Sequence, residues 1–266
     1  MTDGKPELAE YLQRIAGYSL TGSTQEHAMF FLYGLGANGK TTFLNAITQA
    51  AGDYHRTAPI ETFTASSIDR HPTDLAGLRG ARLVTAVETE EGRRWAESRI
   101  KLLTGGDKIA ARFMRQDFFE YIPQFKLIIA GNHKPTLRAV DEAIRRRLNL
   151  IPFTVTIPPD ERDENLPEKL KAELPGILSW MIEGCVSWQE RGLAPPSIVS
   201  DATAAYLEAE DAISAWIEEA GERDPNAWEK SNDLFASWKM WAEKTGEFVV
   251  SVHCSYACSI TENTIW

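Results

Sequence analysis

A glycine-rich turn between an apolar run and a helical stretch constrains this chain more than any other feature. Residues 34–41 read Gly-Leu-Gly-Ala-Asn-Gly-Lys-Thr and match the phosphate-binding motif G-x-x-x-x-G-K-[ST] in full. Residues 28–33 before it form a continuous apolar run typical of a buried parallel strand, and residues 41–51 follow a helical pattern. This strand–loop–helix order is the context that the motif requires, and it separates the match from a chance occurrence in a glycine-rich turn.

The residues of this loop have separate tasks in binding a phosphate chain. Glycines let the backbone turn its N–H groups toward phosphate oxygens, and the start of the helix adds a positive dipole. We expect Lys40 to neutralise the β- and γ-phosphates and the Thr41 hydroxyl to bind Mg²⁺. The sequence therefore predicts ATP and Mg²⁺ as ligands. The residues expected to contact them are Gly34, Gly36, Ala37, Asn38, Gly39, Lys40, Thr41 and Thr42.

Two further strand ends carry polar residues suited to act beside that loop. The apolar run 82–87 ends in Glu88 and Glu90, and ligands of parallel sheets bind at the carboxyl ends of strands. We expect Glu88 to hold the metal and Glu90 to activate the attacking water; the roles are interchangeable, and a solvated strand end is the alternative. The run 126–130 is followed by Asn132, whose amide is expected to hold the γ-phosphate or that water.

Three consecutive arginines, 145–147, form a dense basic cluster. One of Arg146 and Arg147 is expected to act as an arginine finger on the ATP of a neighbouring subunit. The alternative is a solvated helix end, where cations are favourable near the negative end of the dipole. The sequence leaves both interpretations open.

Charge is distributed unevenly along the chain. The net charge is −10, but residues 79–147 carry fifteen Lys/Arg against nine Asp/Glu, whereas residues 160–247 carry eight against twenty. A DNA partner needs only a local basic surface, because phosphate contacts act within about one Debye length. The middle of the chain therefore remains compatible with nucleic acid, and solvated surfaces are the alternative.

Apolar runs and helical patterns alternate through the first part of the chain, which favours an α/β core with a mainly parallel sheet. A helix is expected over 91–103, and two strands over 109–114 and 118–122 flank a polar turn. Pro158-Pro159 and Pro195-Pro196 mark breaks. The expected divisions are an N-terminal helical segment, an ATPase domain, a helical connector, a partial winged-helix-like region and an atypical tail, at 1–28, 29–158, 159–200, 201–250 and 251–266.

The order of these motifs resembles the superfamily 3 helicases of the phage and plasmid primase–helicase type. Thr104-Gly105-Gly106-Asp107 and Asn132-His133-Lys134-Pro135 are more specific signals than the phosphate-binding loop alone. The resemblance covers about residues 6–247. Its segments are 31–41, 88–92, 101–107 with Arg112, 131–135, and 145–147 with 151–153.

The resemblance implies an AAA+-like P-loop ATPase core that assembles as a ring, usually a hexamer, with ATP bound between subunits. It implies single-stranded DNA in the central channel, held by a β-hairpin that corresponds here to residues 108–122. The implied DNA contacts are Lys108, Arg112, Arg115 and Gln116. A primase domain is expected on a separate chain, if one takes part. Residues 207–247 resemble the start of a winged-helix-like domain, and the resemblance stops before residue 251.

The expected function is that of an ATP-dependent DNA helicase motor. One alternative is a ring-forming ATP-binding module for replication initiation that does not unwind DNA, and another is an inactive truncated remnant. No apolar run has the length of a membrane span, and the N-terminus has no signal-peptide pattern, so a cytoplasmic location without a membrane partner is expected. Cys254 and Cys258 with His253 lack an evident fourth ligand for zinc, which disfavours a metal site there.

Overall fold

The computed structural model describes residues 2–66, 73–88, 91–220 and 230–246. Glu90 and the tail 251–266, with its two cysteines, lie outside the described residues. The chain divides into two compact units, which are considered separately here. The first comprises Met1–Thr136 and Ala143–Ala204, and the second comprises Leu137–Glu142 and Ala205–Trp266.

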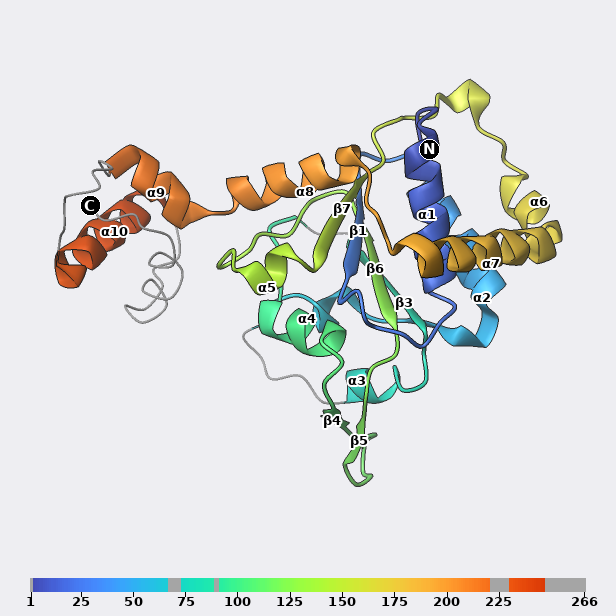
Figure 1. The fold of residues 1–266 in the computed structure, drawn as a ribbon, viewed down its shortest axis with the longest axis horizontal. Helices are drawn as coiled ribbons and strands as arrows, with labels where there is room; N and C mark the ends of the chain where they lie inside the picture. The colour runs from blue at the N-terminus through green and yellow to red at the C-terminus, as the bar shows by residue number, and fades with distance from the viewer. Residues whose placement is uncertain (1, 67–72, 89–90, 221–229, 247–266) are drawn as a thin grey trace. The chain divides into compact units, whose positions relative to one another are not determined.

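A five-stranded parallel sheet forms the centre of the first unit (Figure 1). Its strand order is β2-β3-β6-β1-β7, so β6 lies between the strand that precedes the phosphate-binding loop and the strand that ends in Glu88. The expected α/β core with a parallel sheet is confirmed. The strands are β1 (Met29–Tyr33), β2 (His55–Thr57), β3 (Leu83–Glu88), β6 (Lys126–Gly131) and β7 (Leu148–Pro152).

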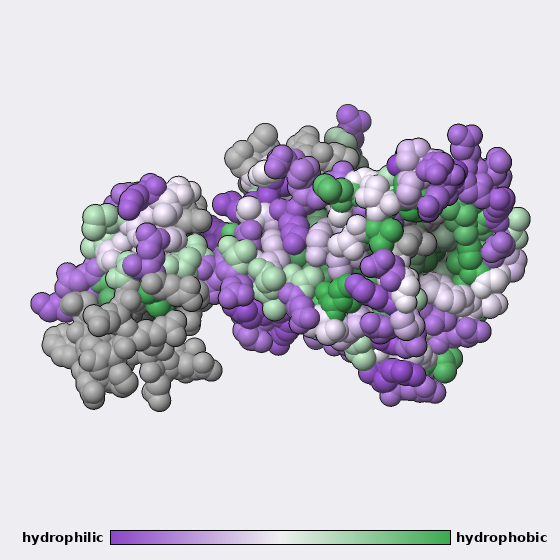
Figure 2. All heavy atoms as spheres, turned by 90° about the horizontal axis from the view of Figure 1, so that it is seen from above, coloured by the Kyte–Doolittle hydropathy of each residue, from purple (hydrophilic) through white to green (hydrophobic). Residues whose placement is uncertain are grey.

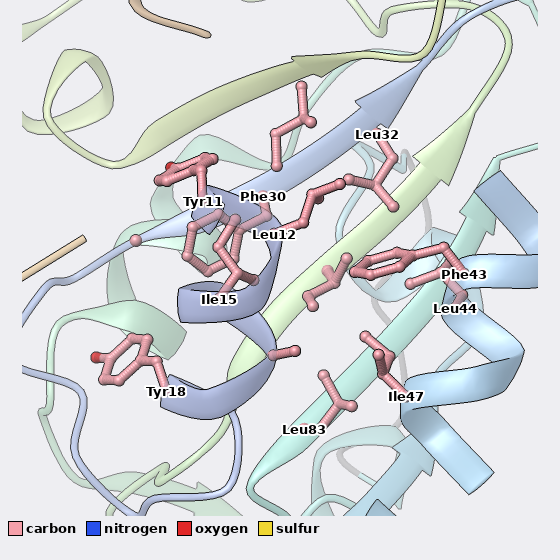
Figure 3. Close-up of a cluster of buried hydrophobic side chains, with 14 of the residues drawn as sticks. Tyr11, Leu12, Ile15, Tyr18, Phe30, Leu32, Phe43, Leu44, Ile47 and Leu83 are labelled. Atoms are coloured by element: carbon pink, nitrogen blue, oxygen red, sulfur yellow. The ribbon is translucent and has the colours of Figure 1, made fainter. Parts of the chain in front are cut away.

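Side chains of β1 pack on both faces of this sheet, because alternate side chains of a strand point in opposite directions. Phe30 and Leu32 pack in a cluster with α1 and α2, as Figure 3 shows, whereas Phe31 meets the Trp95 ring edge-on at 5.5 Å. The cluster also contains Tyr11, Leu12, Ile15, Phe43, Leu44 and Ile47. The helices on this side are α1 (Pro6–Tyr18), α2 (Lys40–Ala51) and α7 (Leu174–Arg191).

Two glycines allow α1 and α7 to touch backbone to backbone. A Cβ added at Gly17 would lie 2.0 Å from the backbone nitrogen of Cys185, and one added at Gly184 would lie 2.1 Å from the carbonyl oxygen of Gln13. Any side chain at either position would push the helices apart. The N-terminal helix is thereby held against α7 within the same compact unit as the sheet.

Several local elements differ from those expected. The helix expected over 91–103 is α4 (Glu97–Thr104), because Arg94 and Trp95 form β-bridges with Thr136 and Thr64 instead. Strand β2 and the short helix α3 (Thr73–Ala76) carry no apolar period that would have predicted them. The other elements between residues 52 and 172 are β4 (Ile109–Ala111), β5 (Phe119–Tyr121), α5 (Glu142–Arg145), α6 (Leu166–Ala172) and the 3-10 turns η1 (Gly52–Tyr54), η2 (Ile60–Thr62) and η3 (Pro159–Glu161).

The described part of the region expected to resemble a winged helix consists of helices. These are α8 (Ser197–Ala209), α9 (Ala212–Ala220) and α10 (Ser231–Thr245). Trp216, Trp238 and Ala242 are buried together between α9 and α10, and the two indole rings lie 5.8 Å apart. No strand occurs among residues 201–220 and 230–246, so these residues do not show a wing.

Hydrophilic side chains cover much of the face seen in Figure 2, with hydrophobic patches among them. Within the described ranges, no helix is both long and apolar enough to cross a membrane.

A buried lysine at the start of β6 ties the segment after α1 to the sheet. Lys126 is 1% exposed, and its ammonium donates hydrogen bonds to the carbonyl oxygens of Thr21, Ser23 and Gln124. Its nitrogen also lies 4.7 Å from the centroid of the Tyr18 ring. Burial, reinforced by the nearby charge of Arg82, lowers the pKa of Lys126 to about 7.

This burial predicts a pH-dependent stability that Lys126→Met removes. Between about pH 7 and about pH 10 the unfolded chain binds a proton at Lys126 that the folded chain does not, since the unfolded pKa is about 10.4. The wild-type free energy of unfolding therefore rises with pH in this window, by up to about 1.4 kcal/mol per pH unit, relative to Lys126→Met. Urea titrations at several pH values measure the difference. Lys171→Met, at an exposed lysine of α6, should keep the rise, and equal slopes for Lys126→Met and wild type contradict the prediction.

Candidate functional site

The loop between β1 and α2 adopts backbone conformations that require glycine at two points. Gly34 has φ 148° and Gly39 has φ 87°. A Cβ at Gly34 would also lie 2.1 Å from the carbonyl oxygen of Phe153, which leaves no room for a side chain. Ala37 adopts φ 60°, a conformation that is uncommon for residues other than glycine. The motif glycines are therefore needed for the shape of the loop.

Asn38 braces the loop from inside. It is 3% exposed, and its side-chain nitrogen donates to the carbonyl oxygens of Phe153, at 2.9 Å, and Leu35. Its side-chain oxygen accepts a 3.4 Å hydrogen bond from the backbone N–H of Lys40. These contacts tie the loop to the chain just beyond β7. Asn38 was expected to contact nucleotide, and in the structure its side chain forms hydrogen bonds with Leu35, Lys40 and Phe153.

The start of α2 has the features of an anion-binding site. Its N-cap is Gly39, and no side chain caps the helix or places an acid in its first turn. Thr41 is exposed and Thr42 is half-buried, while a Cβ at Gly36 would meet nothing within 4 Å. The N–H groups of a helix start need partners, and a phosphate group supplies them. The residues present therefore fit the expected nucleotide.

Lys40 connects the loop to the end of β6. Its ammonium nitrogen donates to the carbonyl oxygen of Gly34 and to the side-chain oxygen of Asn132, the latter at 3.2 Å. Burial lowers the pKa of Lys40. Two residues that the sequence placed in separate motifs are thus in direct contact.

Glu88 lies at the same edge of the sheet. It is 3% exposed and is paired in register with Gly131, which in turn is paired with Tyr33 of β1. A Cβ at Gly131 would lie 3.0 Å from the Cβ of Glu88 and 2.8 Å from the Phe31 ring. The missing side chain at this position lets the ends of β3, β6 and β1 lie together. The structure therefore brings Lys40, Asn132 and Glu88 to one edge.

The two candidate finger arginines differ in their surroundings. Arg147 is 6% exposed, and its guanidinium donates to the Thr104 hydroxyl at 3.1 Å and to the Ala143 carbonyl oxygen at 2.7 Å. Arg146 is exposed. Within this chain Arg147 joins the end of α4 to the segment before β7, and Arg146 is the one available to another molecule.

The expected hairpin forms, with shorter strands than the sequence indicated. β4 and β5 pair antiparallel, with Ala111 opposite Phe119. The four residues expected to contact DNA lie on it: Lys108, Arg115 and Gln116 are exposed, and Arg112 is half-buried. They are grouped with one another and do not belong to the cluster around Lys40.

Sequence reasoning missed several contacts at these sites. The ammonium of Lys134 lies 4.1 Å from the centroid of the Tyr33 ring, which joins the segment after β6 to the end of β1. The bracing role of Asn38 and the burial of Arg147 were also missed. A continuous run of three arginines carries no signal that distinguishes the buried one, because that distinction depends on Thr104, more than forty residues away.

The contrast between the two arginines predicts different effects on stability. Arg147→Ala removes two hydrogen bonds from a buried site and should lower the free energy of unfolding by roughly 1–3 kcal/mol. Arg146→Ala changes an exposed side chain and should stay within about 0.5 kcal/mol of wild type. Urea unfolding of the two variants gives the comparison, and equal losses would show that Arg147 is not a structural brace.

Comparisons with known proteins give one matching family and two similar viral proteins. A protein family of unknown function (DUF5906) matches residues 32–147, the stretch from β1 through the arginine cluster. "Putative helicase L207/L206" of Acanthamoeba polyphaga mimivirus is 26% identical over 88% of this chain and 27% of its own length. "Putative helicase 022R" of Frog virus 3 (isolate Goorha) is 25% identical over 87% of this chain and 26% of its own length. The chain therefore spans about a quarter of the length of these relatives.

Solved structures share the fold at low sequence identity. Two apo structures of the NrS-1 C-terminal region each superpose with a TM-score of 0.57. One is 9% identical and covers 81% of this chain and 57% of its own, and the other is 11% identical and covers 94% and 56%. The chain is similar in fold to the NrS-1 C-terminal region and similar in sequence to these two viral proteins.

Proposed function

We propose that this chain is an ATP-hydrolysing motor of the helicase type that moves along single-stranded DNA. The observation that carries the proposal is the hydrogen bond between Lys40 and Asn132, at an edge where Glu88 lies beside Gly131. The start of α2 and the ends of β6 and β3 thereby contribute a cation, an amide and a carboxylate to one edge of the sheet. The names of the two viral relatives support the same class of activity.

The phosphate-binding loop would hold the triphosphate of ATP. Backbone N–H groups of residues 34–41 and the start of α2 would face the phosphate oxygens. Lys40 would exchange its contact with the Gly34 carbonyl oxygen for a phosphate oxygen, which is the stronger, charge-assisted partner. The Thr41 hydroxyl and the Glu88 carboxylate are the groups that would hold Mg²⁺, which neutralises phosphate charge when bound.

Asn132 and Glu90 are proposed to act on the attacking water. The amide of Asn132 already lies 3.2 Å from the Lys40 ammonium, and from there it would orient water or the terminal phosphate. Glu90, two residues beyond Glu88, is proposed as the base that accepts the proton from water. The roles of the two glutamates can be exchanged without changing the rest of the scheme.

Arg146 is proposed as the finger that completes the site of a neighbouring copy. It is the exposed member of the pair, whereas the guanidinium of Arg147 is engaged within its own chain. A finger supplied in trans requires a neighbouring copy at the site, and a ring, usually a hexamer in the superfamily 3 helicases, supplies one for every subunit. The hairpin carrying Lys108, Arg112, Arg115 and Gln116 is proposed to contact the DNA strand.

ATP turnover with and without single-stranded DNA tests the proposal. Wild type should hydrolyse ATP faster when DNA is added. The turnover rate of Lys40→Ala should be at least about tenfold lower than that of wild type under both conditions, because the substitution removes a charge-assisted contact to phosphate. Lys171→Ala, at an exposed lysine of α6, serves as the matched control and should behave as wild type.

The outcomes separate the candidate functions. Turnover that survives Lys40→Ala would contradict the proposed site. Turnover that depends on Lys40 but ignores DNA would favour an ATP-dependent assembly module over a motor. If DNA stimulates turnover, strand separation of a forked duplex is the assay that distinguishes unwinding from movement alone.

A further inference from the structure

The tip of the β4–β5 hairpin presents large apolar side chains to solvent. All residues from 113 to 118 are exposed, and Phe113, Met114 and Phe118 are 42%, 70% and 59% exposed. Figure 1 shows the hairpin projecting from the rest of the first unit. Several exposed apolar residues grouped on one projection mark an interaction site, because a lone domain gains nothing by exposing them.

The exposed ring of Phe113 continues an ordered row of rings that is anchored in the protein. The ring centroids of Phe113 and Phe119 are 6.0 Å apart, as are those of Phe119 and Tyr121. The Tyr121 hydroxyl donates a 2.5 Å hydrogen bond to the carbonyl oxygen of Leu75, which fixes the inner end of the row on α3. The guanidinium of Arg79 lies 5.0 Å from the Phe119 centroid. The outer end of the row, at Phe113, faces solvent.

The backbone of the tip is held in an uncommon conformation. Arg115 has φ 61°, in the left-handed region that residues with a side chain seldom adopt. The Arg112 guanidinium lies 4.6 Å from the Phe118 ring centroid, and among the described residues no group accepts a hydrogen bond from its Nε. Arg112 therefore lies beside an exposed ring, and Arg115 is an exposed residue of the tip between Phe113 and Phe118 in the chain.

The charge of the hairpin shows which part of a DNA strand it can bind. Residues 108–122 contain three cations and two carboxylates, so the hairpin as a whole has an excess of only one positive charge. Attraction to phosphates scales with the number of cations that replace counterions, and it is weak where carboxylates offset them. The apolar rings are the groups left to supply affinity. The charged residues are Lys108, Arg112, Arg115, Asp117 and Glu120.

We propose that Phe113 and Phe118 bind single-stranded DNA by stacking on its unpaired bases, with Arg112 and Arg115 beside them at the backbone. The inference rests on the proposed function and names the part of the substrate that the hairpin reads. Stacking on ring faces tolerates any base sequence, as movement along DNA requires. It also selects single strands, because in a duplex the base faces are already covered by neighbouring bases.

A comparison of normal and abasic strands tests this with the wild-type protein alone. The probe is a fluorescently labelled oligothymidylate, titrated by anisotropy, beside a strand of the same length that keeps the phosphates but lacks the bases. We expect the abasic strand to bind at least about tenfold more weakly, since stacking contributes about five- to hundredfold in affinity per base. Equal affinity for the two strands, or no binding of either, overturns the inference.

Substitutions at the tip separate stacking from charge. Phe118→Trp should retain binding, whereas Phe118→Leu, which is apolar but has no ring face, should lose about five- to hundredfold with an unchanged salt dependence. Arg115→Ala should instead reduce the slope of log affinity against log salt by about one. Val186→Ala on α7, at an apolar residue that is 51% exposed, is the control and should bind as wild type.

Two further outcomes identify where the inference fails. If Phe118→Leu binds DNA as tightly as Phe118→Trp, the rings do not stack on bases and the inference is wrong. The proposed function still holds in that case if wild-type turnover depends on Lys40 and is stimulated by DNA. If Phe113→Ala and Phe118→Leu alter self-association in sedimentation experiments and leave DNA affinity unchanged, the tip is an interface between copies and the inference is wrong. Unchanged melting temperatures of the variants show that folding is preserved.

Discussion

The parallel register that places Gly131 between Glu88 and Tyr33 is the constraint on which the proposed site depends. It aligns the carboxyl ends of β1, β3 and β6, so that residues far apart in sequence meet without any loop having to reach across the sheet. Glycine is required at this point because a Cβ would press on both the Glu88 side chain and the Phe31 ring. The hydrogen bond from Lys40 to Asn132 is the direct consequence of this alignment.

Near that edge, two polar side chains that the sequence assigned to ligand binding form hydrogen bonds within the chain and hold its backbone in place. Asn38 holds the loop to the backbone of Phe153, and Arg147 holds the end of α4 near β7. A loop braced in this way keeps its glycine-dependent conformation, so in the proposed site a phosphate group would meet N–H donors that are already arranged. The groups that remain accessible, at the start of α2 and at Arg146, are then those suited to a ligand or a neighbouring copy.

The sequence predicted the centre of the first unit better than its periphery. Continuous apolar runs identified β1, β3 and β6, and the phosphate-binding motif located the turn into α2, because these features are local. Strand β2 has only three residues, and the bridges of Arg94 and Trp95 depend on partners remote in sequence, so neither has a local signal. The hairpin was predicted, but its strands are shorter, and the residues expected to extend them form the exposed tip. The winged-helix-like resemblance is not visible in the described helices, and the expected role of Glu90 stays a prediction.

The central claim is that the loop and the end of β3 form one site for ATP with Mg²⁺. Calorimetric titration of a non-hydrolysable ATP analogue, with and without Mg²⁺, tests it most directly in wild type and Glu88→Gln. If Glu88 helps to hold the metal, Mg²⁺ strengthens binding to wild type and has little effect on the variant. Equal strengthening by Mg²⁺ in both proteins, or no binding of the analogue to wild type, would contradict the account.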